Sequence, residues 1–232
     1  MPGQRTREAL GRYGRRAPLG SRPLALGARG WDVAALQFAL ALHGFPSGAF
    51  DGYLGAHTDA ARRRFQAWAG ITPDGTAGPR TVAALRGPPP RSRITFSRPL
   101  PGPTGDLFGP RGPRFHAGVD FPAAFGTPVA AAGAGRVVFA GPGGGGWGTM
   151  VVIAHGHGVR TRYAHLSRIV VRLGERLAAG ASVGLVGASG EVKGPHLHFE
   201  VLVRGANVDP MTAFARVASP GRQSNRRPGG FH

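Results

Sequence analysis

The segment HLHFEV at residues 196–201 decides the fold class of the C-terminal half of this chain. Its polar and apolar residues alternate, which is the period of a β-strand with one face in a core. A core has no need of two imidazoles and a carboxylate on one side of a central strand, so His196, His198 and Glu200 form a candidate functional face. Glu200 lies one strand step beyond His198, which favours a supporting role over that of a general base.

Two segments upstream carry residues that suit the same chemistry. In HAGVD at residues 116–120, an imidazole and a carboxylate lie four apart around a glycine and can converge on one cation. Two histidines and one aspartate make a catalytic zinc set with a fourth position for water. In YAH at residues 163–165, alternation puts Tyr163 and His165 on one face, where a further imidazole could move protons or hold an oxyanion. Each segment alone is a weak signal, whereas all three together are much more specific.

The surrounding sequence predicts an all-β antiparallel domain over residues 96–215. Six segments have strand-like patterning and are joined by glycine-rich turns: 127–131, 135–140, 150–154, 159–164, 182–186 and 196–203. Helix signals are nearly absent there. The three consecutive prolines at 88–90 favour an extended spacer, so residues 87–95 are expected to be a Pro-rich linker and a domain boundary.

Residues 30–86 have helical patterning and contain an internal repeat. The pattern D-G-x-x-G-x-x-T occurs at 51–58 and at 74–81, each time as a turn followed by a helix. We expect a first helix capped by Asp32 and ended by Gly44, a second over 59–69 and a third over 79–85. These predict a small all-α unit of roughly 60 residues, near the lower limit for an independent core. The arginine run 62–64 is expected on a solvated helix face.

Composition narrows the possible chemistry. The 232 residues include no cysteine, which excludes disulfides and a thiol nucleophile, so any metal must be held by His, Asp or Glu. The chain has 29 Lys and Arg against 11 Asp and Glu, a net charge of +18. A surface with this charge could bind anionic cell-wall polymers, nucleic acid or acidic lipids. The alternative explanation for the charge is a coding bias toward arginine. No nucleic-acid recognition motif accompanies the arginines, so no specific nucleic-acid partner is expected.

The two ends of the chain lack periodicity. Residues 1–29 and 216–232 are rich in Arg, Gly and Pro, which predicts a disordered basic arm and a disordered tail. No apolar run is long enough to span a bilayer. Residues 1–30 carry only short apolar stretches between arginines, so no signal peptide is visible there.

The chain resembles the lysostaphin/LytM-type zinc metallopeptidases, which cut peptide cross-bridges of bacterial peptidoglycan. The resemblance runs from about residue 96 to 210 and rests on FGPR at 108–111, HAGVDF at 116–121, GTPV at 126–129, YAHL at 163–166 and GPHLHFE at 194–200. It implies that His116, Asp120 and His198 bind one Zn²⁺ per chain and that His165 and His196 are the catalytic pair. It leaves open which of that pair is the general base. The repeat over residues 30–85 resembles the three-helix peptidoglycan-binding module often attached to such enzymes.

We therefore expect a two-domain, zinc-dependent endopeptidase of bacterial peptidoglycan with a wall-binding module. Its substrate implies an extracytoplasmic location, secreted or in the cell wall, and anionic wall polymers are a further candidate partner. The main alternative is a non-catalytic wall-binding regulator of another hydrolase on the same fold. The cross-link that is cut and the oligomeric state are left open.

Overall fold

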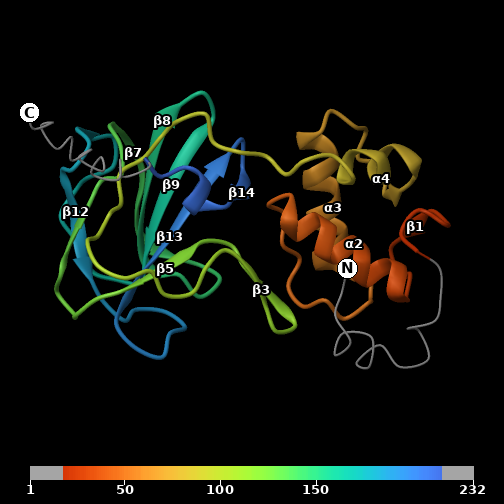
Figure 1. Ribbon diagram of the computed structural model, residues 1–232, viewed down its shortest axis with the longest axis horizontal. Coiled ribbons are helices and arrows are strands. Elements are labelled where there is room, and N and C mark those ends of the chain that lie inside the picture. The colour runs from red at the N-terminus through yellow and green to blue at the C-terminus, as the bar shows by residue number, and fades with distance from the viewer. Residues whose placement is uncertain (1–17, 216–232) are drawn as a thin grey trace, which may run out of the picture.

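Strand β13 (His196–Val203) lies inside the largest sheet of the protein, whose computed structural model describes residues 18–215 (Figure 1). β9 (Val159–Ala164) pairs with one edge of β13. The other edge pairs first with β5 (Val119–Pro122) and then with β14 (Ala206–Val208). The sheet continues beyond β9 with β8 (Gly148–Gly156), β7 (Gly135–Gly143) and β11 (Arg176–Leu177). Every strand pair in it is antiparallel.

A second, three-stranded sheet completes the core of the β domain, the name used here for residues 96–215. Its strands, in spatial order, are β10 (Leu166–Ile169), β12 (Ser182–Val186) and β6 (Pro128–Ala130). Apolar side chains of both sheets share one cluster, into which β13 projects Leu197, Phe199 and Val201. The prediction of an antiparallel all-β domain is confirmed.

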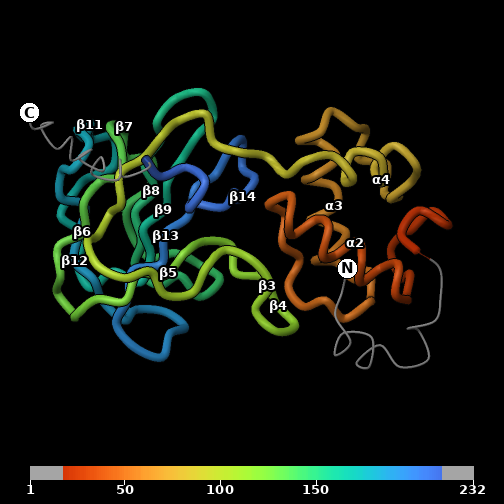
Figure 2. Tube along the Cα trace, in the orientation of Figure 1, coloured from red at the N-terminus to blue at the C-terminus, as the bar shows by residue number. Residues whose placement is uncertain are grey.

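Apart from β6, the short strands of this domain were not predicted. β3 (Gly109–Arg111) and β4 (Arg114–His116) form a separate hairpin, which Figure 2 shows extending toward the helices. Strands of three or four residues are too short for alternation to stand out, and β5 also ends on Pro122. The predicted strands 159–164, 182–186 and 196–203 have the bounds seen in the structure, and the other three differ at their ends.

The helical module, residues 18–86, contains the three predicted helices. They are α2 (Trp31–Leu42), α3 (Ala56–Trp68) and α4 (Pro79–Leu85). Gly30, not Asp32, is the N-cap of α2; Asp32 lies buried in the first turn and pairs with Arg22. No helix within residues 18–215 is long and apolar enough to cross a membrane.

A buried glutamine explains the internal repeat of the module. The Gln37 amide nitrogen lies 2.8 Å from Asp51 Oδ1 and 3.1 Å from Thr58 Oγ1, the first and last residues of the first repeat. The Gln66 amide nitrogen makes the equivalent contacts in the second repeat, 3.2 Å to Asp74 Oδ1 and 3.0 Å to Thr81 Oγ1. Each repeat is therefore a loop closed on a glutamine of the preceding helix.

Two expectations for the N-terminal region are wrong. The sequence predicts disorder for residues 18–29, but β1 (Leu24–Ala25) pairs with β2 (Thr76–Ala77), and Leu24 is fully buried. Three short helices leave apolar surface that this segment covers.

The second wrong expectation is the solvated position of Arg62. This residue is fully buried, and its guanidinium contacts Asp59 and the Leu24 carbonyl. The predicted disorder of residues 1–17 and 216–232 lies outside the described residues.

Candidate active site

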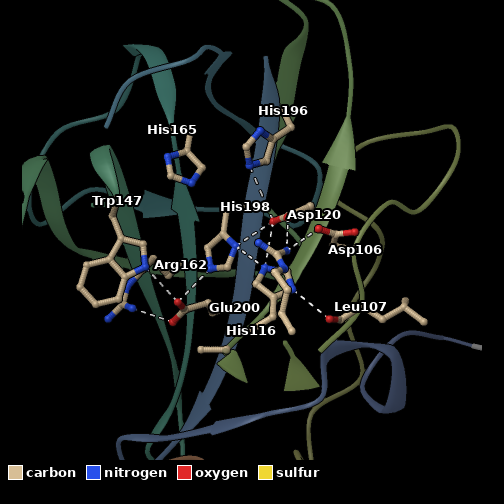
Figure 3. Close-up of polar contacts among 12 residues, drawn as sticks. Asp106, Leu107, His116, Asp120, Trp147, Arg162, His165, His196, His198 and Glu200 are labelled. Atoms are coloured by element: carbon tan, nitrogen blue, oxygen red, sulfur yellow. Dashed lines mark hydrogen bonds and ion pairs between the residues drawn. The ribbon is translucent and has the colours of Figure 1, made fainter. Parts of the chain in front are cut away.

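Three side chains converge beside the first half of β13 (Figure 3): His116 from the end of β4, Asp120 from β5 and His198 from β13. Asp120 Oδ1 lies 2.8 Å from His198 Nδ1 and 3.1 Å from His116 Nε2. The two imidazole nitrogens lie 3.0 Å apart. All three residues are almost fully buried. The structure thus brings together two sequence segments that lie about 80 residues apart.

Strand register and one glycine produce this convergence. His198 lies directly opposite Asp120 on β5 and opposite Ala164 on β9, so a carboxylate and a small side chain flank the imidazole. A Cβ added to Gly118 would overlap the Phe199 carbonyl oxygen and would lie 2.9 Å from His198 Cε1. Only glycine lets the chain between β4 and β5 approach β13 so closely, and this approach brings His116 beside His198.

Each histidine of this cluster is oriented through its second nitrogen. His116 Nδ1 donates to the Leu107 carbonyl over 2.9 Å, because a carbonyl oxygen can only accept. His198 Nε2 donates to the Glu200 carboxylate over 3.0 Å. His116 Nε2 and His198 Nδ1 can therefore direct lone pairs toward a cation beside Asp120. Such outer hydrogen bonds are typical of histidines that bind metals.

The donor atoms fit a tetrahedral metal. Bonds of about 2.0–2.1 Å place tetrahedral ligands roughly 3.3–3.4 Å apart. The three donors lie 2.8–3.1 Å apart, so movements of a few tenths of an ångström would accommodate an ion. Two imidazoles and one carboxylate also suit a divalent metal such as zinc.

The charges at the site also call for a cation. Burial alone would raise the pKa of Asp120, but hydrogen bonds with His116 and His198 hold that pKa well below its usual range. Burial would lower the pKa of His198, but its hydrogen bonds to Asp120 and Glu200 raise that pKa to about 9. The two carboxylates thus favour positive charge between them. A divalent metal ion would supply it and would release the proton.

Glu200 is fully buried, and its carboxylate accepts four hydrogen bonds. His198 and Trp147 each donate to Oε1 over 3.0 Å. Arg162 and Asn207 donate to Oε2 over 2.6 and 2.7 Å. Burial alone would raise the pKa of Glu200, but these partners, His198 and Arg162 above all, lower it. The carboxylate therefore stays charged and holds His198 in place.

The partners of Glu200 were not predicted from sequence. Arg162 comes from β9, Asn207 from β14 and Trp147 from the residue before β8. Arg162 lies directly opposite Glu200 in the sheet. The position of Arg162 opposite Glu200 is the one signal that could have identified Arg162. That position is known only once the register of β9 against β13 is known.

His165 and His196 lie together on one side of the three-residue cluster (Figure 3), with ring centroids 4.8 Å apart. His165 Nδ1 donates to the Ser189 carbonyl over 2.8 Å, and His196 Nδ1 donates to the Gly194 carbonyl over 2.9 Å. Nε2 of each ring is left to accept a proton, and that of His196 lies 3.8 Å from Asp120 Oδ1. Burial lowers the pKa of His165 to about 4, so this ring is neutral near pH 7.

His165 reaches the site by a route that strand alternation does not predict. Tyr163 points into the core, where its hydroxyl accepts from the Ala132 N–H over 2.8 Å, and Ala164 lies opposite His198. Alternation would therefore send His165 into the core as well. Instead His165 has a φ of +62°, a left-handed conformation that turns it toward the site. The prediction that Tyr163 and His165 share a face is wrong for this reason.

The site opens into a groove of about 820 Å³ that is lined by all five histidine and aspartate residues described above. Arg111, at the end of β3, also lines it. Its guanidinium lies 2.9 Å from Asp120 Oδ2 and 2.7 Å from Asp106 Oδ2. Arg111 is the last residue of the FGPR motif, but nothing in the sequence spacing connects it with Asp120, so its role was not predicted.

A second H-x-H pair, His155 and His157, lies outside the cluster. His155 is in β8 and contacts the Ala134 carbonyl and Thr161 Oγ1. His157 is exposed in the turn after β8, with a φ of +49°. Neither residue belongs to the group of side chains that could hold a metal ion.

Comparison with known families agrees with the two-part architecture. Residues 29–85 match the peptidoglycan-binding model PG_binding_1. Residues 114–210 match the model of peptidase family M23. Residues 114–210 belong to peptidase family M23. The M23 domain contains His116, Asp120, His165, His196 and His198, and its family consists of metallopeptidases.

The M23 domain also resembles curated proteins. Peptidoglycan DD-endopeptidase ShyA of Vibrio cholerae is 45% identical over 110 residues, 45% of this chain and 24% of that protein. DD-carboxypeptidase/endopeptidase Mpg of Neisseria meningitidis is 42% identical over 99 residues, 43% of this chain and 23% of that protein. The solved catalytic domain of lysostaphin from Staphylococcus simulans is 34% identical, with 47% of this chain and 89% of that chain covered and a TM-score of 0.45. The chain spans about a quarter of the length of these curated relatives.

Proposed function

We propose that this chain is a zinc-dependent endopeptidase that hydrolyses peptide cross-links of bacterial peptidoglycan. The observation that carries the proposal is the cluster of His116, Asp120 and His198, in which each imidazole has an outer hydrogen-bond partner, beside two further histidines. The M23 match supports the reaction class. The DD-endopeptidase names of the relatives support the substrate and favour a bond between D-amino acids.

His116 Nε2, Asp120 Oδ1 and His198 Nδ1 would hold one zinc ion per chain. Bound zinc supplies Lewis-acid chemistry, because it polarises a peptide carbonyl and makes water nucleophilic near neutral pH. The Leu107 carbonyl and Glu200 keep the two imidazoles in the tautomers that can ligate. Arg111 binds Asp120 Oδ2, which leaves Oδ1 directed at the two histidines.

His165 and His196 are the proposed catalytic pair. Their Nδ1 atoms are committed to backbone carbonyls, so Nε2 of either ring can take a proton from the attacking water and pass it to the leaving amine. A protonated ring could instead donate to the oxyanion of the tetrahedral intermediate. The neutral state of His165 suits the first role.

The proposed division of the chain is a wall-binding module at residues 18–86, a linker at 87–95 and a peptidase domain at 96–215. The PG_binding_1 match supports the binding role, and tethering to the polymer would raise the local substrate concentration. Exposed arginines of the module, such as Arg64 and Arg80, suit anionic wall polymers as additional ligands. A peptidoglycan substrate implies that the protein acts outside the cytoplasm, secreted or in the wall.

The non-catalytic regulator is less well supported. A regulator on this fold needs neither a complete set of metal ligands nor a neutral histidine in a groove. This chain has the ligand set and has His165, and the groove gives solvent access to His165 and His196.

The proposal is tested by digesting purified peptidoglycans, with direct links or with glycine bridges, and identifying the released fragments by mass spectrometry. We expect fragments cut at the cross-link from the wild-type protein and none from His198→Ala. A wild-type protein that binds one zinc ion yet cuts neither polymer nor soluble cross-linked peptides would contradict the enzyme assignment and favour the regulator.

A further inference from the structure

The helical module packs against the β domain at its edge strand β14. The Asn207 N–H donates to the Gly44 carbonyl over 3.0 Å. Ala206, the preceding residue, is fully buried and belongs to the apolar core of the module. A Cβ added to Gly44 would overlap the Asn207 carbonyl oxygen, so only glycine permits this contact.

Two further contacts reach the β domain from the module. Trp68, the last residue of α3, donates its indole N–H to the Val203 carbonyl over 3.3 Å, and the Arg204 guanidinium lies 4.9 Å from the centre of a Trp68 ring. The Phe50 N–H donates to the Pro113 carbonyl, over 2.8 Å, in the turn of the β3–β4 hairpin. Figures 1 and 2 show that both this hairpin and β14 lie on the side of the β domain that faces the helices.

The contact at Asn207 continues into the candidate metal site. The Asn207 side-chain amide donates to Glu200 Oε2 over 2.7 Å and to the Ala117 carbonyl over 3.2 Å. Glu200 in turn accepts from His198 Nε2, and Ala117 follows His116 directly in the chain. One residue therefore joins the module to the surroundings of two proposed zinc ligands.

We propose that the docked helical module is a positioning element of the active site, which it supports by fixing Asn207 through the Gly44 contact. This inference rests on the proposed zinc site. Asn207 is a positioning residue, because its amide acts on His198 through Glu200 and on His116 through the Ala117 carbonyl. The module thus has a role in catalytic geometry that is separate from wall binding.

A simpler arrangement, in which the two parts merely touch, makes a different prediction. Loss of the contact would then weaken wall binding or module stability and would leave the metal site unchanged. If the module positions Asn207, loss of the contact loosens Glu200 and lowers zinc affinity. Loss of an outer hydrogen-bond partner of a metal ligand typically costs about 10–100-fold in affinity or activity.

The two arrangements are distinguished by comparing Gly44→Ala with Gly70→Ala in the full chain. Both glycines follow the end of a module helix with positive φ, +89° for Gly44 and +71° for Gly70, so alanine strains both in the same way. A Cβ at Gly70 meets nothing within 4 Å, whereas one at Gly44 collides with β14. Any difference between the variants therefore reports on docking.

Three measurements are made on each variant: zinc affinity by competition with a chelator, kcat and KM on a soluble cross-linked peptide, and the visible absorption of the Co²⁺-substituted protein. We expect Gly44→Ala to lose about 10–100-fold in zinc affinity relative to Gly70→Ala, with an altered Co²⁺ spectrum. The loss in turnover should lie in kcat, because so small a peptide does not depend on the module. Equal values for the two variants would overturn the proposal.

Asn207→Ala provides a second test, since it removes the side-chain amide and keeps the backbone N–H that binds Gly44. We expect it to reproduce the zinc and Co²⁺ effects, and the Gly44→Ala/Asn207→Ala double variant to lose little more than either alone. Fully additive losses would contradict a shared route. If Gly44→Ala does not fold, Trp68→Phe replaces it: that change removes the bond to Val203 and shrinks the ring beside Arg204, both contacts with the β domain, and an unchanged zinc affinity would count against the proposal. A wild-type chain that binds no zinc would instead overturn the proposed function.

Discussion

Asp120 lies directly opposite His198 in the β5–β13 ladder, and its Oδ1 atom is 2.8 Å from His198 Nδ1. Two of the three proposed ligands are therefore held by adjacent, hydrogen-bonded backbone. His116 joins them across a glycine that lies against β13. Because the donors are prearranged, we expect zinc to bind with little rearrangement of the sheet.

The first prediction concerns the ligands. His116→Ala and His198→Ala should each lose stoichiometric zinc and all hydrolysis, because each removes one of three donors. Elemental analysis after dialysis measures the metal. His157→Ala is the matched control, since His157 is an exposed turn residue outside the cluster and should keep one zinc per chain. Retention of full zinc by His198→Ala would show that this assignment is wrong.

The second prediction separates the two histidines of β13. They share a face, but alternate residues of a strand lie roughly 6–7 Å apart, too far for both to reach a metal at about 2.0–2.1 Å without bending the strand. His196→Ala and His165→Ala should therefore keep zinc and lose about 10²–10⁴-fold in kcat. Zinc content and turnover are measured on the same preparations. Near wild-type turnover in His196→Ala would mean that this ring only packs beside the site.

The third prediction concerns Glu200. Glu200→Gln keeps the shape of the side chain but offers His198 Nε2 and Arg162 a neutral partner. We expect zinc affinity to fall about 10–100-fold, measured by chelator competition. Glu191→Gln is the control, because Glu191 also lines the groove but is exposed. Equal affinities for the two variants would show that Glu200 does not orient the ligand.

The fourth prediction concerns His155 and pH. Burial lowers the pKa of His155, so the folded protein binds fewer protons at this ring than the unfolded chain does. The free energy of unfolding should therefore fall as pH drops below about 6.5, by at most about 1.4 kcal/mol per pH unit. Thermal unfolding of wild type and His155→Gln is compared from pH 7.5 downward. Parallel curves for the two proteins would exclude this contribution.

The long, alternating segments could be predicted from sequence because their pattern matches what the sheet requires. In β13, one face enters the core and the other carries the site, so alternation identified His196, His198 and Glu200 together. β5 could not be found this way, since four residues ending on a proline carry almost no pattern. The proximity of Asp120 to His198 depends on that strand, so the residue pattern offered Asp120 only as a candidate ligand and the family resemblance assigned it.

Other features depend on the backbone or on distant contacts. His165 reaches the groove through a positive φ that no side-chain pattern encodes. Trp147, Arg162 and Asn207 meet at Glu200 only after three strands have paired. Residues 18–29 lacked periodicity because their contribution is a single buried leucine on a two-residue strand.

Ala206 gives the chain an unusual order of assembly during synthesis. Residues 18–86 leave the ribosome first, but one buried residue of their apolar core, Ala206, comes from β14. That strand follows α4 by about 120 residues, roughly 10 s of translation at about 5–20 residues per second. Until the C-terminal sheet has formed, the part of the module's apolar core that contacts Ala206 therefore stays exposed to solvent. A chain stalled before β14 would present that apolar surface to chaperones and to neighbouring nascent chains.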